Sequence, residues 1–255
     1  KEYDSIDDWD SLQTLLNNAL ADYNDSNAVM DLVLFRDAMK HVCRISRIIG
    51  NSSGHALLVG VGGSGKQSLT KLASHICGYQ TMSIVISGGY NLANFKEDLQ
   101  KMYRISGLKG EGVTFLLTEA QIVDERFLVL NNDLLASGEV QDLFAQEDKD
   151  EFCNAMRGEV KAAGQIDTAD NCWAFFINKV KANLHVVFTT SPVGEDFRIR
   201  SQRFLATVTC TVIDWFQPWP ENSLLDGATK FLSDVDLGDA ATRKGIAEFM
   251  PFSFK

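Results

Sequence analysis

The 255-residue sequence lacks the cysteine and histidine patterns that mark several classes of small protein. Its five cysteines are scattered and never form a C-x-x-C pair, and its four histidines show no metal-ligand spacing. We therefore predict neither a zinc site nor a disulfide framework, and the cysteine usage favours a reducing intracellular compartment. The histidines are interpreted as ordinary surface or half-buried residues.

Long apolar runs and a surplus of basic residues are absent too. No apolar stretch approaches the roughly 18 residues of a membrane span, and no signal-peptide pattern is present. The formal net charge of −10 leaves no basic excess to neutralise phosphates, so we expect neither a nucleic-acid nor a membrane partner. The chain begins without Met and stops within the apolar "FMPFSFK", which favours a piece of a longer polypeptide.

What the sequence contains is an alternation of short apolar strands and amphipathic helices. We expect strands at 56–60, 81–87, 112–119, 184–190 and 207–216, and a turn with a short extended segment within 137–144. Helical periodicity covers 9–20, 29–49, 67–77, 92–102, 123–136, 149–164 and 172–182, and a further helix follows the prolines at 218 and 220. The alternation predicts an α/β fold whose mostly parallel sheet is covered by helices on both faces. We expect N-terminal helices and a linker at 1–50, the α/β core at 51–220 and a C-terminal helical part at 221–255.

A glycine-rich stretch between the first strand and the next helix matches G-x-x-x-x-G-K, a phosphate-binding loop. Glycines adopt the positive φ values that turn backbone N–H groups toward an anion, and the helix that follows directs its positive end to the same place. The residues of this predicted nucleotide site are Gly60, Val61, Gly62, Gly63, Ser64, Gly65 and Lys66. The alternative is a glycine-rich turn with an incidental lysine, but the strand before and the helix after favour binding of ATP or ADP.

The position after the lysine departs from the usual pattern. A Ser or Thr there gives Mg²⁺ a hydroxyl ligand, whereas this chain offers the longer amide of Gln67. Ser68 stands one residue further, on a different side of the helix, and is a substitute only after a local adjustment. Gln67 and Ser68 are thus the candidate metal ligands, and Mg²⁺ binding is predicted to be weak.

The strand at 112–119 supplies the second expected element. P-loop ATPases place an acidic pair at the end of such a strand, where the Asp helps to hold the metal and the Glu polarises water. Here Glu119 is present, but Thr118 stands where the Asp is expected. Asp124 and Glu125 are a possible substitute, although their position favours the solvated first turn of a helix.

Two further segments offer polar groups to the same site. The strand at 184–190 ends in Thr190, followed by Ser191, where a hydroxyl can touch a terminal phosphate or simply end the strand before Pro192. The segment "DFRIRSQRF" carries Arg200 and Arg203, candidates for an arginine that reaches a neighbouring subunit's phosphate. From spacing alone, a solvated basic helix edge explains these arginines as well.

Together these motifs resemble an AAA+ module of the dynein heavy chain, and most specifically the fourth module of axonemal dyneins. The resemblance rests on "LLVGVGGSGKQSL", "DERFLVLNNDLLASGEV", "NCWAFFI", "SPVG" and "RIRSQRF". It implies the large subdomain of a P-loop NTPase (AAA+) within a single-chain ring of six modules. It also implies that Lys66 is the Walker A lysine, Glu119 the Walker B glutamate and Thr190 or Ser191 the first sensor.

The resemblance further implies partners and a place in the cell. The neighbouring AAA+ modules would contact this one, with Arg200 and Arg203 serving the adjacent site, while light and intermediate chains and microtubules would be reached through the whole motor. The location implied is the cytoplasmic cytoskeleton of the ciliary or flagellar axoneme. An adenine pocket is implied around Leu32, Val33 and Leu34, for which core packing is an equal alternative. The helical lid and the microtubule-binding stalk of the family are expected to be missing, with at most a first lid turn at the end.

Three functions follow from these features. The first is a regulatory nucleotide-binding module with weak or slow hydrolysis, because both metal-associated positions are altered in the same direction. The second is a competent ATPase, since Mg²⁺ often keeps several waters and needs only one or two protein ligands. The third is a structural spacer with a relic loop, which the intact Lys66 and Glu119 disfavour.

Overall fold

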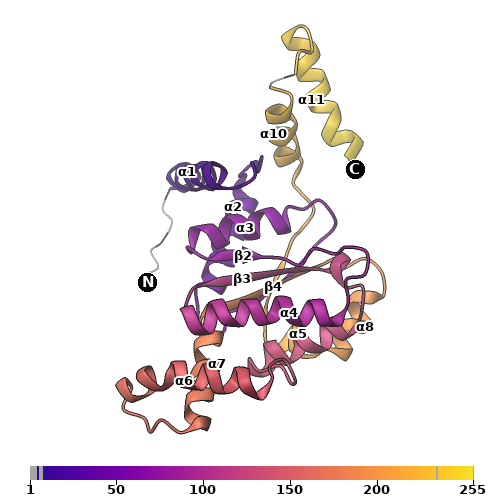
Figure 1. Ribbon diagram of the computed structural model, residues 1–255. Helices are drawn as coiled ribbons and strands as arrows, with labels where there is room; N and C mark the ends of the chain where they lie inside the picture. Colours follow the sequence, from indigo (N-terminus) through magenta and orange to yellow (C-terminus); the bar gives the residue numbers. More distant parts are fainter. Residues whose placement is uncertain (1–4, 6–7, 234, 255) are drawn as a thin grey trace.

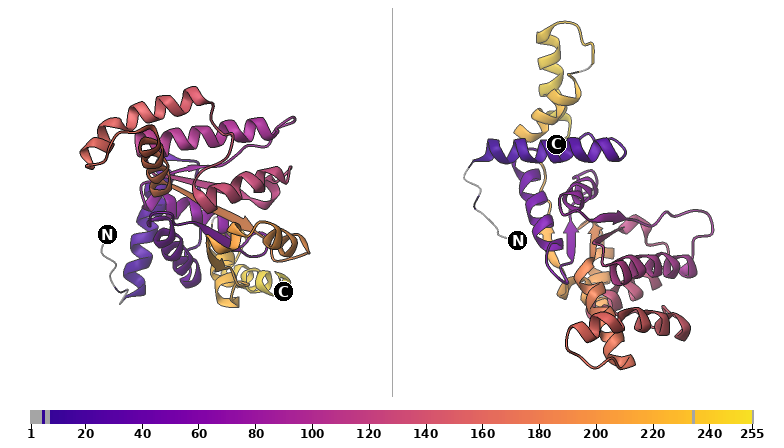
Figure 2. Two further views of the ribbon diagram at one scale, coloured as in Figure 1. Left: turned by 90° about the horizontal axis from the view of Figure 1, so that it is seen from below. Right: turned by 60° about the vertical axis from the view of Figure 1, so that its left-hand side comes forward.

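The computed structural model describes residues 5, 8–233 and 235–254 of the chain. A five-stranded sheet in the order β2-β3-β4-β1-β5 forms the centre, and every neighbouring pair is parallel. The strands are β1 (Ala56–Val59), β2 (Gln80–Met82), β3 (Val113–Thr118), β4 (Leu184–Thr190) and β5 (Val212–Trp215). Helices cover both faces (Figures 1 and 2), which confirms the expected α/β architecture.

The helices fall into groups by position. Two helices precede the first strand in the chain: α1 (Trp9–Ser26) and α2 (Arg36–Ile49). The strands are connected by α3 (Lys66–Ile76), α4 (Leu92–Tyr103), α5 (Arg126–Ser137), α6 (Gln146–Ala162) and α7 (Ala169–Asn183). Short helices α8 (Asp196–Arg203) and α9 (Ala206–Thr209) precede β5, and a π-helical stretch (Arg104–Lys109) and a 3₁₀ turn (Glu119–Gln121) flank β3. The last two, α10 (Glu221–Phe231) and α11 (Ala240–Phe254), pack together and project from the body (Figure 1).

The central strands bury both of their faces, as a parallel sheet between two helical layers requires. In β1, Leu57 and Val59 face the core under α4, α5 and α7, whereas Leu58 faces the core under α2 and α3. In β3, Phe115 joins the first of these cores and Leu116 the second. The alternation holds each strand between two apolar layers and fixes where its carboxyl end lies.

The connections of β1 and β4 run in opposite directions along the sheet. The chain leaves β1 through α3 to reach β2 at one edge, and leaves β4 through α8 and α9 to reach β5 at the other edge. Ligand sites of open α/β sheets lie beyond the carboxyl ends of strands at such a reversal. The segments that follow β1 and β4 therefore mark where a site is to be sought.

The helix expected at 29–49 begins only at Arg36. Phe35 is extended, and the residues before it give their carbonyl groups to side chains: Gln13 donates to the Leu34 carbonyl at 3.2 Å and Lys230 to the Leu32 carbonyl at 2.6 Å. Side-chain donors from α1 and α10 thus replace the intrahelical hydrogen bonds. The apolar pattern here serves burial and not helix formation.

Two strand predictions also need correction. The segment predicted as a strand at 81–87 is extended with ladder pairing only to Met82, because Gln121 donates to the Ile84 carbonyl at 2.6 Å and Val85 is exposed. The first half of 207–216 forms α9, so the strand starts at Val212. Within 137–144, predicted as a turn and a short extended segment, the structure has a bend at Gly138 and a turn in which Asp142 has a φ of 52°.

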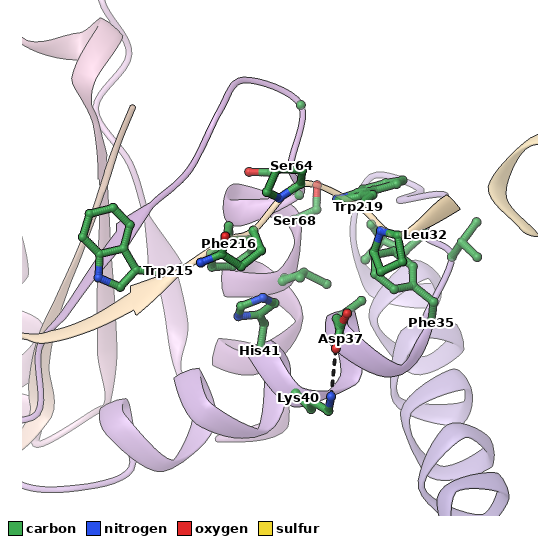
Figure 3. A pocket seen from close by; sticks show the side chains of 18 of the residues that line it. Leu32, Phe35, Asp37, Lys40, His41, Ser64, Ser68, Trp215, Phe216 and Trp219 are labelled. Carbon is green, nitrogen blue, oxygen red and sulfur yellow. Dashed lines mark hydrogen bonds and ion pairs between the residues drawn. The ribbon is translucent and has the colours of Figure 1, made fainter. Parts of the chain in front are cut away.

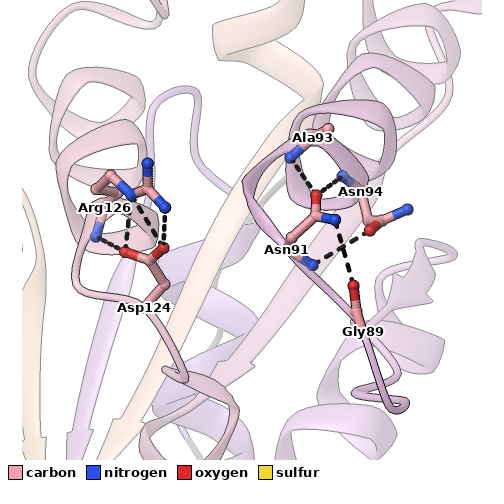
Figure 4. Close-up of polar contacts among 6 residues, drawn as sticks. All are labelled: Gly89, Asn91, Ala93, Asn94, Asp124 and Arg126. Carbon is pink, nitrogen blue, oxygen red and sulfur yellow. Dashed lines mark hydrogen bonds and ion pairs between the residues drawn. The ribbon is translucent and has the colours of Figure 1, made fainter.

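Capping side chains set where two of the helices begin. Asn91 accepts from the amides of Ala93 and Asn94 and starts α4, and Asp124 accepts from the amide of Arg126 at the start of α5 (Figure 4). The latter explains why the helix predicted from 123 begins at Arg126. At the far end α11 extends over 15 residues, well beyond the single turn expected there.

Candidate functional site

The loop after β1 has the backbone of a phosphate cradle. Gly63 and Gly65 have φ values of 75° and 85°, and a Cβ added at Gly62 or Gly63 would meet nothing within 4 Å. α3 begins at Lys66 directly after the loop, so its first amides face the loop. Open space around glycines in this conformation fits an anion held by backbone N–H groups.

The side chain of Lys66 folds back into this loop. Its Nζ donates to the carbonyl oxygens of Gly60 at 2.6 Å and Val61 at 2.7 Å, and to the Ser64 hydroxyl at 3.1 Å. Partial burial lowers the pKa of the Lys66 ammonium from its usual value, and the negative charge of Glu119 opposes that shift. The cation is therefore held at the loop by weak neutral acceptors, which phosphate oxygens can replace with charge-assisted bonds.

Gln67 and Ser68, the candidate metal ligands, point to different surroundings. Gln67 is exposed in the first turn of α3, whereas Ser68 lines a cavity on the other side of the loop together with Ser64. At the end of β3, Thr118 is buried and is the N-cap of the 3₁₀ turn, where its backbone amide donates to Oε1 of Gln121 at 2.8 Å. Among the described residues no group of three His, Cys, Asp or Glu side chains is placed to hold a metal.

Glu119 is engaged on both of its carboxylate oxygens. Oε2 accepts from the Thr190 hydroxyl at 3.1 Å and from the amide of Ser191 at 2.9 Å, and Oε1 accepts from the Arg200 guanidinium at 3.2 Å. The structure thus brings together the predicted Walker B glutamate, the two sensor candidates and one arginine candidate. All of them belong to this chain, so the contact of Arg200 is made within the module.

The remaining charged candidates lie further out. Arg203 forms an ion pair with Glu125, and both side chains are more than half exposed, at 62% and 51%. Asp124 binds Arg126 through its side chain and backbone (Figure 4), an arrangement that lowers the pKa of the Asp124 carboxyl. Asp124 therefore starts α5 and does not replace the missing acid of β3.

A cavity of about 370 Å³ opens on the α2 side of the loop. Its wall includes Leu32 and Val33, two of the three residues proposed for an adenine pocket, whereas Leu34 is buried in the core beneath α2. Aromatic and apolar groups share the rest with charged side chains such as Asp37 and Lys40, and Phe216 lies beside Ser64 and Ser68 and Trp219 beside Leu32 (Figure 3). The size and lining suit a planar heterocycle attached to phosphates in the loop.

The sequence analysis missed the floor of this cavity. His41 stacks on Phe216 with ring centroids 3.8 Å apart and an interplanar angle of 10°. Its Nδ1 lies 2.6 Å from Oδ2 of Asp214. The other carboxylate oxygen of Asp214, Oδ1, accepts from Arg44 at 3.0 Å. His41, His55 and His185 are all buried, so the expectation of surface or half-buried positions was wrong for these three. The aromatic run "DWFQPWP" after the last strand was the available signal.

The sequence comparisons agree with this geometry. The family described as "P-loop containing dynein motor region D4" matches residues 30–254. The chain belongs to this family. The match confirms the resemblance to the fourth AAA+ module of axonemal dyneins. The loop, the cavity and the Glu119 contacts all lie within the matched region.

Curated relatives of this D4 chain are heavy chains of cilia and flagella. The chain is 68% identical over 255 residues to "Dynein alpha chain, flagellar outer arm" of Chlamydomonas reinhardtii, with 100% of the chain and 6% of the relative covered. It is 53% identical over 251 residues to "Dynein beta chain, flagellar outer arm" of the same organism, covering 98% and 6%. "Dynein axonemal heavy chain 9" of Homo sapiens is 45% identical over 251 residues, again covering 98% and 6%. The D4 chain thus spans about 6% of the length of these relatives.

No helix among the described residues of the D4 chain is long and apolar enough to cross a membrane.

Proposed function

We propose that the chain is a nucleotide-binding regulatory module within the ring of an axonemal dynein heavy chain, and that its own hydrolysis is weak or slow. The observation that carries the proposal is a contrast at one loop. Lys66 and the glycines form an open cradle beside an aromatic cavity, whereas Thr118 is occupied as a cap and Glu119 accepts three hydrogen bonds from this same chain. ATP or ADP is the ligand that fits a phosphate cradle next to such a cavity.

In this proposal each group has a limited role. The loop amides and Lys66 bind the phosphates, and Phe216 and Leu32 enclose the base in the cavity. Bound nucleotide supplies the terminal phosphate, and the chain's own residues determine whether that phosphate is cleaved or retained. Glu119 is the group that would orient a water, and Mg²⁺ would be held mainly by phosphate and water because Gln67 is exposed.

The wider context is also part of the proposal. The named relatives are dynein heavy chains of cilia and flagella, so we place this module in a microtubule motor at the axoneme. Neighbouring AAA+ modules of the same heavy chain are its direct partners. Light and intermediate chains and microtubules are reached through the whole motor, and the module sets the motor's output through the nucleotide that it holds.

A competent ATPase is the second candidate, and one observation favours it. Glu119 lies close enough to Lys66 for its charge to act on the ammonium, so the acidic group and the loop belong to one site. A structural spacer with a relic loop is a third reading, and the open geometry at Gly62 and Gly63 argues against it.

The test uses the intact heavy chain, with the P-loop lysines of the other modules replaced so that this site alone is read. Lys66→Ala should weaken nucleotide binding by about 50-fold, because a charged donor to phosphate contributes roughly 2–3 kcal/mol. Lys71→Ala, on the same helix but outside the loop, is the matched control and should leave affinity unchanged. Unchanged binding in Lys66→Ala would refute both nucleotide-dependent functions.

A second measurement separates regulation from turnover. Glu119→Gln should leave the bound nucleotide largely as it was if the site hydrolyses slowly. If Glu119→Gln traps ATP where the unmodified chain holds ADP, the site is a competent ATPase and the regulatory assignment gives way.

A further inference from the structure

The helix α8 presents one face to the core and the other to solvent. Phe197 and Phe204 pack against the core under α5, and Phe204 is only 6% exposed. Arg200 lies three residues after Phe197 and four before Phe204, so helical geometry puts its side chain on the same inward face. Arg198 and Arg203 are exposed. Of the three arginines in "RIRSQR", Arg200 alone is turned toward the site.

Arg200 completes a set of donors around one carboxylate. The Arg200 guanidinium donates a hydrogen bond to Oε1 of Glu119. The Thr190 hydroxyl and the Ser191 amide, at the end of β4, donate to Oε2. The two charged side chains are mostly covered, with exposures of 21% and 27%, so solvent screens the pair less than an open surface pair. A general base must accept a hydrogen bond from the water that it activates, and here the accepting lone pairs are largely in use.

We propose that Arg200 is a positioning residue that latches Glu119 within the module and keeps it from orienting water. The latch acts through Glu119 and through α8, whose place is fixed by Phe197 and Phe204. Hydrolysis at this site then requires the Arg200 side chain to leave Oε1 of Glu119. The inference rests on the proposed function, since it explains slow turnover at a site that still grips nucleotide.

The latch also divides the work between two arginines. Arg203 is exposed and pairs with Glu125 at the surface, so it stays available to a neighbouring module. Arg200 is committed inward by its contact with Glu119.

The first test needs no nucleotide turnover. In the intact heavy chain, hydrogen–deuterium exchange is measured over residues 191–203 for Arg200→Ala, Glu119→Gln, the double variant and Arg198→Ala. We expect each of the first two to speed exchange by about tenfold and the double variant to add no more, because one contact is removed in all three. Arg198→Ala removes the same charge from the same helix and should leave exchange unchanged. An Arg200→Ala chain that exchanges like Arg198→Ala overturns the latch.

The second test measures single-turnover ATP hydrolysis with the other P-loops disabled. Arg200→Ala should raise the rate by about tenfold, and Arg200→Lys should return it most of the way because the cation is kept. An unchanged or slower rate in Arg200→Ala overturns the proposal, since it would make Arg200 neutral or helpful to the reaction. Failure of nucleotide binding is read separately from Lys66→Ala, so loss of the proposed function and loss of the latch give different results.

Discussion

The two sides of the phosphate loop differ in what surrounds them. On the cavity side, defined by Ser68, His41, Phe216 and Trp219, aromatic rings together with charged side chains line an open volume of about 370 Å³. On the carboxylate side, defined by Glu119, Thr190, Ser191 and Arg200, charged groups are paired with one another. Under the proposed function, the groups that would bind the nucleotide and the groups that would cleave it therefore have different surroundings.

The separation has a structural origin. The cavity side rests on α2 and on Phe216, which follows β5, and both belong to the core that includes α3. The carboxylate side rests on β3, β4 and α8, and α8 is anchored in the opposite core. Substitutions at Gln67 and Thr118 affect the metal-associated positions and leave the cavity walls untouched. A module can therefore lose turnover and keep its ligand.

The largest expected effect comes from removing the floor of the cavity. Phe216→Ala would empty a buried, stacked ring and should cost about 3 kcal/mol of local stability, together with most of the nucleotide affinity. Hydrogen exchange of residues 36–49 and nucleotide titration of the intact chain measure the two effects. Phe252→Ala, at a position with 73% exposure, is the control and should change neither. Equal affinity in Phe216→Ala would show that the cavity does not hold the base.

Acid should weaken both sides together, because they share one sheet. Burial, with help from the charges of His185 and Lys181, lowers the pKa of His55 from 6.5 to about 4. Between these values the unfolded chain binds more protons at His55, so stability is full above pH 6.5 and falls as pH drops toward 4. The total is about 3 kcal/mol at most.

Exchange of the β4 amides across this pH range measures the effect. His55→Gln keeps an acceptor for the Val186 amide, which donates to His55 at 3.0 Å, and should flatten the pH dependence. A slope of unchanged steepness in that variant would assign the acid sensitivity to another group.

Restoring the usual metal ligands should strengthen the carboxylate side alone. Gln67→Thr with Thr118→Asp supplies a hydroxyl and a carboxylate near the loop, and we expect Mg²⁺ to tighten nucleotide binding by about tenfold more than in the unmodified chain. Each single change should give less. Titrations with and without Mg²⁺ measure this, and an equal gain without the metal would contradict the assignment.

Ser68 gives the smallest and most local test. Because its side chain lines the cavity, Ser68→Ala should weaken nucleotide binding about fivefold, the value of roughly one hydrogen bond, at any Mg²⁺ concentration. A loss that appears only with Mg²⁺ would place Ser68 on the carboxylate side as a metal ligand.

Much of the fold was readable from local patterns. The strand–loop–helix order around Lys66, the buried strand before Glu119 and the helices α6 and α7 were all expected, because each is specified by its own periodicity. The start of α2 was not, since its preceding residues are held by Gln13 and Lys230 from distant elements.

The sequence by itself determined the loop, the family and the two altered positions, Gln67 and Thr118, because these depend on residue types at fixed spacing. Only the tertiary structure decided that Phe216 stacks on His41 and that Arg200 reaches Glu119. Those pairs join residues that are 175 and 81 positions apart in the chain, and only the strand order of the sheet brings such residues together. The residue types of the site follow from the sequence, whereas their contacts follow from the order of the strands in the sheet.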